Sequence, residues 1–130
     1  MRVVTVIGNR PQFIKASAVS SRLRELGEEI TVHTGQHYDA ELSQVFFYEL
    51  KLPPPEHLLG IGGGTNTAQT ARMLAALEPL LADARPDALL VYGDTNSTLA
   101  GALAQSRGHR RRLHELRAVA DNRDYPHVCG

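Results

Sequence analysis

Short runs rich in apolar or β-branched residues alternate with helical apolar patterns, and this alternation constrains the fold more than any other feature of the sequence. The runs cover residues 3–7, 29–34 and 87–92. Almost wholly apolar strands are typical of a parallel sheet that is covered on both faces. Helical patterns occupy the intervals, over residues 11–26, 40–50, 65–81 and 95–105. The order of elements predicts a doubly wound, Rossmann-like parallel sheet.

The helical patterns carry more detailed expectations. Apolar residues recur at helical spacing in the first one, namely Ile14, Ala18, Val19, Leu23 and Leu26. Pro79 is expected to kink or restart the third helix. The last helix places Leu99, Ala102 and Leu103 on one face, and the strand before it is expected to be buried.

Charge and cysteine content exclude several classes of protein. The 130 residues carry 14 basic and 14 acidic side chains, so no global signal for nucleic acid or an anionic membrane is present. A single cysteine excludes an internal disulfide framework and a cysteine zinc site. No apolar run approaches a membrane span or a signal peptide. We therefore expect a cytoplasmic protein with no nucleic-acid or membrane partner.

The neutral total conceals an asymmetry. Residues 1–105 hold 8 Lys/Arg and 11 Asp/Glu, whereas residues 106–130 hold 6 Arg and 3 Asp/Glu. Residues 106–112 contain no apolar side chain, although a doubly wound sheet requires its next strand here. We therefore expect an incomplete Rossmann-like domain over 1–105 and a divergent basic tail over 106–130.

Ligands of open parallel sheets bind beyond the carboxyl ends of the strands, so the loops after Ile7, Thr34 and Tyr92 are the candidates. Arg10 and Lys15 place two cations around a helix N-terminus, where free N–H groups and the dipole favour an anion. A phosphorylated or nucleotide substrate suits such an edge. Equally, both residues are compatible with an ordinary solvated surface.

Asp94 directly follows the last apolar run and precedes a helix. One interpretation is an N-cap aspartate, which is common in such loops. The other is a carboxylate exposed at the crevice, acting as a general acid/base or a ligand of sugar hydroxyls. His33 and His37 do not share a helical face, so no metal site is expected.

Three segments together resemble one family. Residues 8–15 (GNRPQFIK), 34–39 (TGQHYD) and 91–98 (VYGDTNST) are similar to the non-hydrolysing UDP-N-acetylglucosamine 2-epimerases of bacteria. The similarity covers residues 1 to about 105, with all elements in order.

The resemblance implies the N-terminal half of a glycosyltransferase-B-like fold, usually homodimeric, with the substrate between two Rossmann-like halves. The family interconverts UDP-N-acetylglucosamine and UDP-N-acetylmannosamine for cell-surface polysaccharide synthesis. It removes the C2 proton, expels UDP to give a 2-acetamidoglucal, reprotonates the other face and re-adds UDP. No cofactor is implied.

By motif match, the resemblance implies catalytic roles for Asp94 and Lys15. It implies substrate binding by Arg10, Gln36, His37 and Thr95. The regulatory arginine of some members is not evident in residues 62–66, so allosteric control is not expected.

The family's next motif, His-Val-Glu-Ala-Gly-Leu-Arg with its catalytic glutamate, is absent, and the surroundings of Glu115 do not match it. A frameshifted or truncated reading frame would produce such a divergence. We therefore expect no activity from the chain alone. The alternatives are a non-catalytic half-domain that binds nucleotide sugars and a marginally folded remnant.

Overall fold

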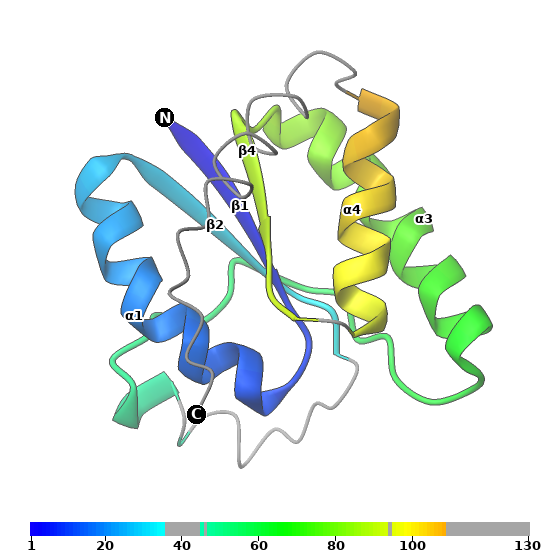
Figure 1. The fold of residues 1–130 in the computed structure, drawn as a ribbon, viewed down its shortest axis with the longest axis horizontal. Helices are drawn as coiled ribbons and strands as arrows, with labels where there is room; N and C mark the ends of the chain where they lie inside the picture. Colours follow the sequence, from blue (N-terminus) through cyan, green and yellow to red (C-terminus); the bar gives the residue numbers. More distant parts are fainter. Residues whose placement is uncertain (36–44, 46, 94, 109–130) are drawn as a thin grey trace, which may run out of the picture.

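Four parallel strands form one sheet with helices on both faces in a computed structural model of the chain (Figure 1). The structure describes residues 1–35, 45, 47–93 and 95–108. The strands lie in the order β3-β2-β1-β4, with bounds β1 Arg2–Ile7, β2 Glu28–His33, β3 His57–Leu58 and β4 Ala88–Val91. The helices are α1 Arg10–Leu26, α3 Asn66–Ala84 and α4 Asn96–Gly108. The predicted doubly wound, Rossmann-like class is confirmed.

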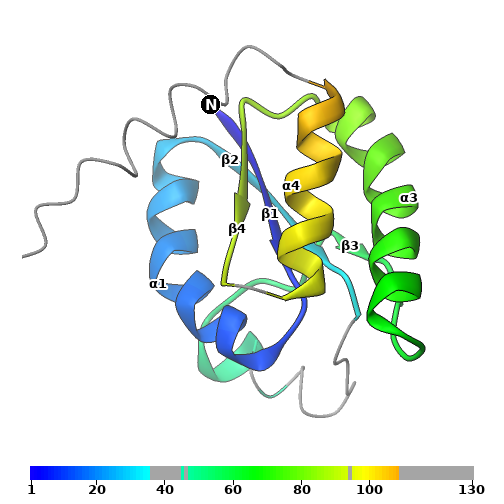
Figure 2. The same cartoon turned by 45° about the vertical axis from the view of Figure 1, so that its right-hand side comes forward.

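The sheet separates two layers of helices. Helices α3 and α4 cover one face and α1 covers the other (Figure 2). Alternate side chains of each strand point to opposite faces, so one strand contributes to both cores. Val4 and Val6 pack with Met73 and Leu77 under α3, whereas Ile7 packs with Phe13 of α1.

Helix α1 buries a different face from the one that its apolar residues suggested. Its buried residues are Gln12, Phe13, Ala16 and Ser20. Three of the expected residues are instead well exposed, with exposed fractions of 52% for Ile14, 38% for Val19 and 57% for Leu26. Polar contacts under the helix explain the difference, because they fix its rotation about its axis.

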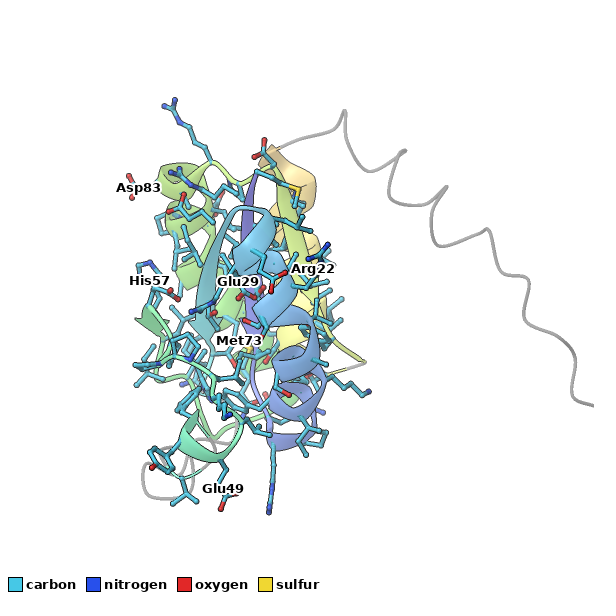
Figure 3. All side chains as sticks on the ribbon, turned by 90° about the vertical axis from the view of Figure 1, so that its left-hand side faces the viewer. Arg22, Glu29, Glu49, His57, Met73 and Asp83 are labelled. Carbon is cyan, nitrogen blue, oxygen red and sulfur yellow. The ribbon has the colours of Figure 1, made fainter. Side chains whose placement is uncertain are left out.

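Glu29 forms the centre of these polar contacts. It lies behind α1, between the helix and the sheet (Figure 3), and its side chain is 1% exposed. Thr5 Oγ1 donates to its Oε1 at 2.7 Å, and Ser20 Oγ and Arg24 Nε donate to its Oε2. A buried carboxylate needs this number of donors to offset its desolvation. The network therefore clamps α1 onto the first two strands.

Helix α3 continues through Pro79, so the helix does not restart there. Proline removes one intrahelical hydrogen bond. Leu77 is fully buried, and Leu80 and Leu81 pack against the same core, so tertiary packing holds the helix together on both sides of the proline. Thr65 caps the start of α3 by accepting a hydrogen bond from the amide of Ala68.

Helix α4 approaches the sheet through small residues and not through its leucines. Ala100 and Ala104 are buried, whereas Leu99 and Leu103 are 52% and 44% exposed. A Cβ built on Gly101 would lie 2.8 Å from Val91 Cγ1, so only glycine permits this close contact. The leucine face is therefore turned away from the sheet.

Strand β4 is half-buried along its whole length, which contradicts the expectation of a buried strand. The reason is its position, because β4 ends the sheet and pairs with β1 alone among the described residues. Strand β3, of two residues, was not anticipated in its loop. Helix α4 extends to Gly108, whereas the sequence pattern predicted that this helix ends at residue 105. No helix in the described part of the chain is long and apolar enough to cross a membrane.

Candidate active site

The carboxyl ends of β1, β2 and β4 meet at one edge of the sheet, because the three strands are parallel neighbours. The loops that leave this edge contain all three segments singled out in the sequence. Of the six predicted site residues, the structure describes Arg10, Lys15 and Thr95. The other three, Gln36, His37 and Asp94, lie outside the described residues.

Gln12 joins the loop after β1 to the loop after β4. Its Oε1 accepts a hydrogen bond from the Gly8 amide at 2.7 Å. Its Nε2 donates to the Tyr92 carbonyl at 2.7 Å and to Thr95 Oγ1 at 2.8 Å. The side chain is buried, so water does not compete for these bonds. One amide therefore fixes the spacing of two of the three loops.

A pair of hydroxyl groups lies beneath the same edge. Thr34 Oγ1 and Ser97 Oγ are 2.8 Å apart and fully buried. A Cβ on Gly8 would lie 2.1 Å from Ser97 Oγ and 2.6 Å from Thr34 Oγ1. The loops after β1 and β2 and the first turn of α4 thus meet at a point where only glycine fits.

The start of α1 presents cations, but few free amides. Asn9 caps the helix by accepting from the Gln12 amide at 3.2 Å, Pro11 has no N–H, and the Phe13 amide donates to the Asn9 carbonyl. The amides of Gln12 and Phe13 are therefore occupied by bonds within the start of the helix. Arg10 and Lys15 are both exposed at this end of the helix. Attraction of an anion here depends on their side chains and on the helix dipole.

Thr95 occupies the position directly before α4, and its carbonyl accepts the hydrogen bond of the Leu99 amide. An N-cap carbonyl accepts the first intrahelical bond, so Thr95 is the N-cap. Asp94 lies outside the described residues, so both interpretations of its role stay predictions. Thr98 Oγ1 also donates to the Tyr92 carbonyl at 2.7 Å, which ties the turn back to the end of β4.

Two titratable groups, the buried His33 and the half-buried Tyr92, flank the edge and stay neutral near pH 7. Burial lowers the pKa of His33 from 6.5 to about 4. Its Nδ1 accepts from the Gly35 amide at 2.8 Å and thereby holds the turn that leads toward Gln36. The pKa of Tyr92 is raised to about 12, mainly by burial and to a smaller extent by the charge of Glu29. Charge at this edge therefore comes from residues other than these two.

A hollow of about 830 Å³ lies elsewhere, between α1 and residues 47–54. Ser20 and Arg24 line it, but both already donate to Glu29. The strand ends remain the better candidate because the sequence motifs gather there. In the described part of the chain, no three His, Cys, Asp or Glu side chains are grouped to hold a metal ion.

Gln12, Thr34 and Ser97 organise the edge, yet sequence reasoning did not single them out. Their position inside the three motifs was the available signal. Residues 21–114, which include Thr34 and Ser97, match the family model for UDP-N-acetylglucosamine 2-epimerase. The chain belongs to this family.

Known relatives agree with this assignment. A UDP-N-acetylglucosamine 2-epimerase homolog of Methanococcus maripaludis is 53% identical over 82% of this chain and 30% of its own length. The UDP-2,3-diacetamido-2,3-dideoxy-D-glucuronate 2-epimerase of Pseudomonas aeruginosa is 53% identical over 84% of this chain and 31% of its own. The chain therefore spans about 30% of the length of these relatives.

A solved structure places the same match in three dimensions. The Methanocaldococcus jannaschii UDP-GlcNAc 2-epimerase, in complex with UDP-GlcNAc and UDP, superposes with a TM-score of 0.78 at 41% identity. The match covers 82% of this chain and 30% of that one. The predicted resemblance and the glycosyltransferase-B-like fold class are confirmed.

Proposed function

We propose that this chain supplies the N-terminal half of the active site of a UDP-N-acetylglucosamine 2-epimerase. The observation that carries the proposal is the junction made by Gln12, which holds the Arg10 loop against the Thr95 loop at the carboxyl edge of a family fold. The reaction interconverts UDP-N-acetylglucosamine and UDP-N-acetylmannosamine by eliminating UDP and adding it back. It requires no redox cofactor.

The chemistry assigns a task to each predicted residue. Departure of UDP develops negative charge on the diphosphate, which nearby cations stabilise, and Arg10 and Lys15 are the exposed cations at this end of α1. Removal and return of the C2 proton require a carboxylate, and we assign that role to Asp94. Thr95, Gln36 and His37 are assigned to contacts with the nucleotide sugar.

Epimerisation also needs groups outside the part of the relatives that this chain matches. The chain spans about 30% of its relatives, and the predicted two-domain architecture provides the remaining acid/base groups and the uridine site from the other part. We therefore expect residues 1–105 to act as the epimerase half-domain and the protein to work in the cytoplasm. A homodimer is the assembly that the family resemblance implies.

A chimeric enzyme tests the proposal. Residues 1–105 of this chain would replace the matching part of the Methanococcus maripaludis relative, and conversion of UDP-N-acetylglucosamine would be followed by proton NMR. We expect turnover, and we expect a loss of at least about a thousandfold in the Asp94→Asn chimera, in the range of other acid/base deletions. A well-folded chimera that binds UDP but never forms the 2-epimer would contradict the proposal.

A second substrate deserves a direct comparison. The Pseudomonas aeruginosa relative, whose name specifies UDP-2,3-diacetamido-2,3-dideoxy-D-glucuronate, is more similar to this chain than the 41% identical UDP-GlcNAc 2-epimerase of Methanocaldococcus jannaschii. Both substrates share the UDP and the 2-acetamido group, which the elimination chemistry uses. Measuring kcat/KM of the chimera for both sugars decides between them. A preference above about tenfold identifies the substrate.

The non-catalytic alternative has its own test. If the half-domain is a binding module, the full chain alone should bind UDP-N-acetylglucosamine, with amide shifts confined to the loops after β1, β2 and β4. Absence of any shift at millimolar ligand would exclude the binding module and leave the epimerase half-domain intact as a proposal.

A further inference from the structure

The hollow of about 830 Å³ between α1 and residues 47–54 lies apart from the loops of the candidate active site. No residue that lines it belongs to the three motif segments, and on α1 its lining comes from the second half of the helix. Its volume suits a small organic molecule. One wall is apolar or aromatic and consists of Phe47, Tyr48, Leu52, Pro53 and Pro54. Tyr48 is 88% exposed, so its ring is available to a ligand.

Lys51 is a cation that a fixed turn holds at this hollow. Its amide donates to the Tyr48 carbonyl at 3.3 Å, and the next amide, of Leu52, donates to the Phe47 carbonyl at 3.0 Å. The two bonds form a Schellman motif, in which Lys51 has the left-handed backbone (φ 52°) that usually favours glycine. The side chain is exposed and forms no ion pair with any residue that the structure describes.

Arg24 is the second cation of the lining, and two carboxylates hold it from beneath. Its Nε donates to Glu29 Oε2 at 3.1 Å, and its Nη2 lies 3.9 Å from Glu56 Oε1. The second distance is too long for a hydrogen bond, so Nη2 is buried without an acceptor among the described residues. Glu29 and Glu56 offset part of the charge of Arg24, but neither lines the hollow. A buried donor of this kind calls for an acceptor, and the hollow is where one can enter.

We propose that this hollow binds a small aromatic anion. The ring lies against the apolar wall, where aromatic and proline side chains offer flat surfaces. The phosphate or carboxylate of the ligand lies at Lys51 and Arg24, since both cations attract an anion and a guanidinium matches the geometry of either group. In the described part of the chain no Asp or Glu lines the hollow to repel it. The inference concerns a second site and does not depend on the proposed function.

NMR titration of the ¹⁵N-labelled full chain tests the proposal. The probes are 1-naphthyl phosphate and 1-naphthoate, with inorganic phosphate and the neutral 1-naphthalenemethanol as their separate components. We expect both aromatic anions to shift amides in residues 20–24 and 47–54. We expect each to bind at least about tenfold more tightly than either component, because the site uses the ring and the charge together. The tighter of the two anions identifies the charged group that the site prefers.

Substitution of Lys51 separates binding from folding. Lys51→Asn removes the charge but keeps a residue that tolerates the left-handed backbone, and it should weaken binding by about tenfold or more. Lys51→Arg should retain binding. Arg85→Asn is the matched control, because Arg85 ends α3 with the same left-handed backbone (φ 46°) and does not line the hollow. Ser21→Phe fills the hollow from an exposed position on α1 and should abolish binding.

Four results would overturn the inference. They are no shift at millimolar 1-naphthyl phosphate, equal affinity for the aromatic anions and the neutral arene, equal weakening by Lys51→Asn and Arg85→Asn, and shifts that centre on the loops after β1, β2 and β4. Urea unfolding of each variant confirms that it is folded, so a loss of binding by Lys51→Asn with an unchanged or raised midpoint supports the site.

Discussion

His33 should make the protein less stable in mild acid, and replacing it should remove that sensitivity. The imidazole is fully buried at the end of β2, beside the ring of Phe13 at 5.0 Å between centroids. Its Nδ1 accepts the Gly35 amide, so the folded state holds the neutral ring. Protonation would replace this acceptor with a donor and place a charge in an apolar setting.

The size of the effect follows from the shift in pKa. Burial lowers the pKa of His33 from 6.5 to about 4, so between these values the unfolded chain binds a proton that the folded chain does not. Stability due to the neutral ring is therefore fully present above pH 6.5 and is lost as the pH falls toward 4. Each pKa unit corresponds to about 1.4 kcal/mol, which gives a loss of about 2.5 kcal/mol between pH 7.5 and pH 4.5.

Urea unfolding of the full chain and of His33→Gln at both pH values measures this loss. Acid-dependent contributions of other groups are common to both proteins and cancel in the comparison. We expect the wild-type midpoint to fall by about 1 to 2 M more than that of the variant. His57→Gln, at an exposed position, serves as the control.

Two results would refute the reasoning. The first is an equal acid dependence in wild type and His33→Gln. The second is an NMR titration in which His33 protonates near pH 6.5 in the folded protein. Either would mean that the ring is not held neutral by its surroundings.

Three further substitutions test the junction of the loops by urea unfolding at pH 7.5. Gln12→Met removes three hydrogen bonds and should lower the free energy of unfolding by about 2 to 4 kcal/mol. A loss no larger than that of a Gln→Met change at an exposed position would contradict the junction. Gly8→Ala places a Cβ against the hydroxyl pair and should lower the free energy of unfolding by about 2 kcal/mol or more. Adding Ser97→Gly should restore part of this stability, because it removes one of the two hydroxyl groups. Asn9→Ala should cost about 1 kcal/mol, whereas Asn9→Asp retains the cap; equal losses in both would argue against capping.

The strands and their order of appearance were predictable because runs such as residues 3–7 carry a local signal. The rotation of α1 was not, because it depends on the contact of Ser20 with Glu29, which lies on the next strand. Pro79 shows the same limit, since packing of Leu77 and its neighbours outweighs the local preference of proline. Burial of β4 depends on which strand ends the sheet, and that is a property of the assembled topology.

The candidate site was likewise predictable from the sequence only in part. The carboxyl edge was predictable because parallel strands bring their following loops together. The role of Gln12 was not, because its partners Tyr92 and Thr95 are 80 and 83 residues away along the chain. Sequence motifs therefore located the loops, while the contact that fixes their spacing emerged only from the folded arrangement.

The buried amide of Gln12 has a consequence for how a ligand would be recognised. Loops that must be ordered on binding lower the affinity through lost conformational entropy. Here the Arg10 loop and the Thr95 loop are already joined when the half-domain folds. A substitution of Gln12 would thus lower the affinity for the ligand through a loss of conformational entropy, although every group that touches the ligand would still be present.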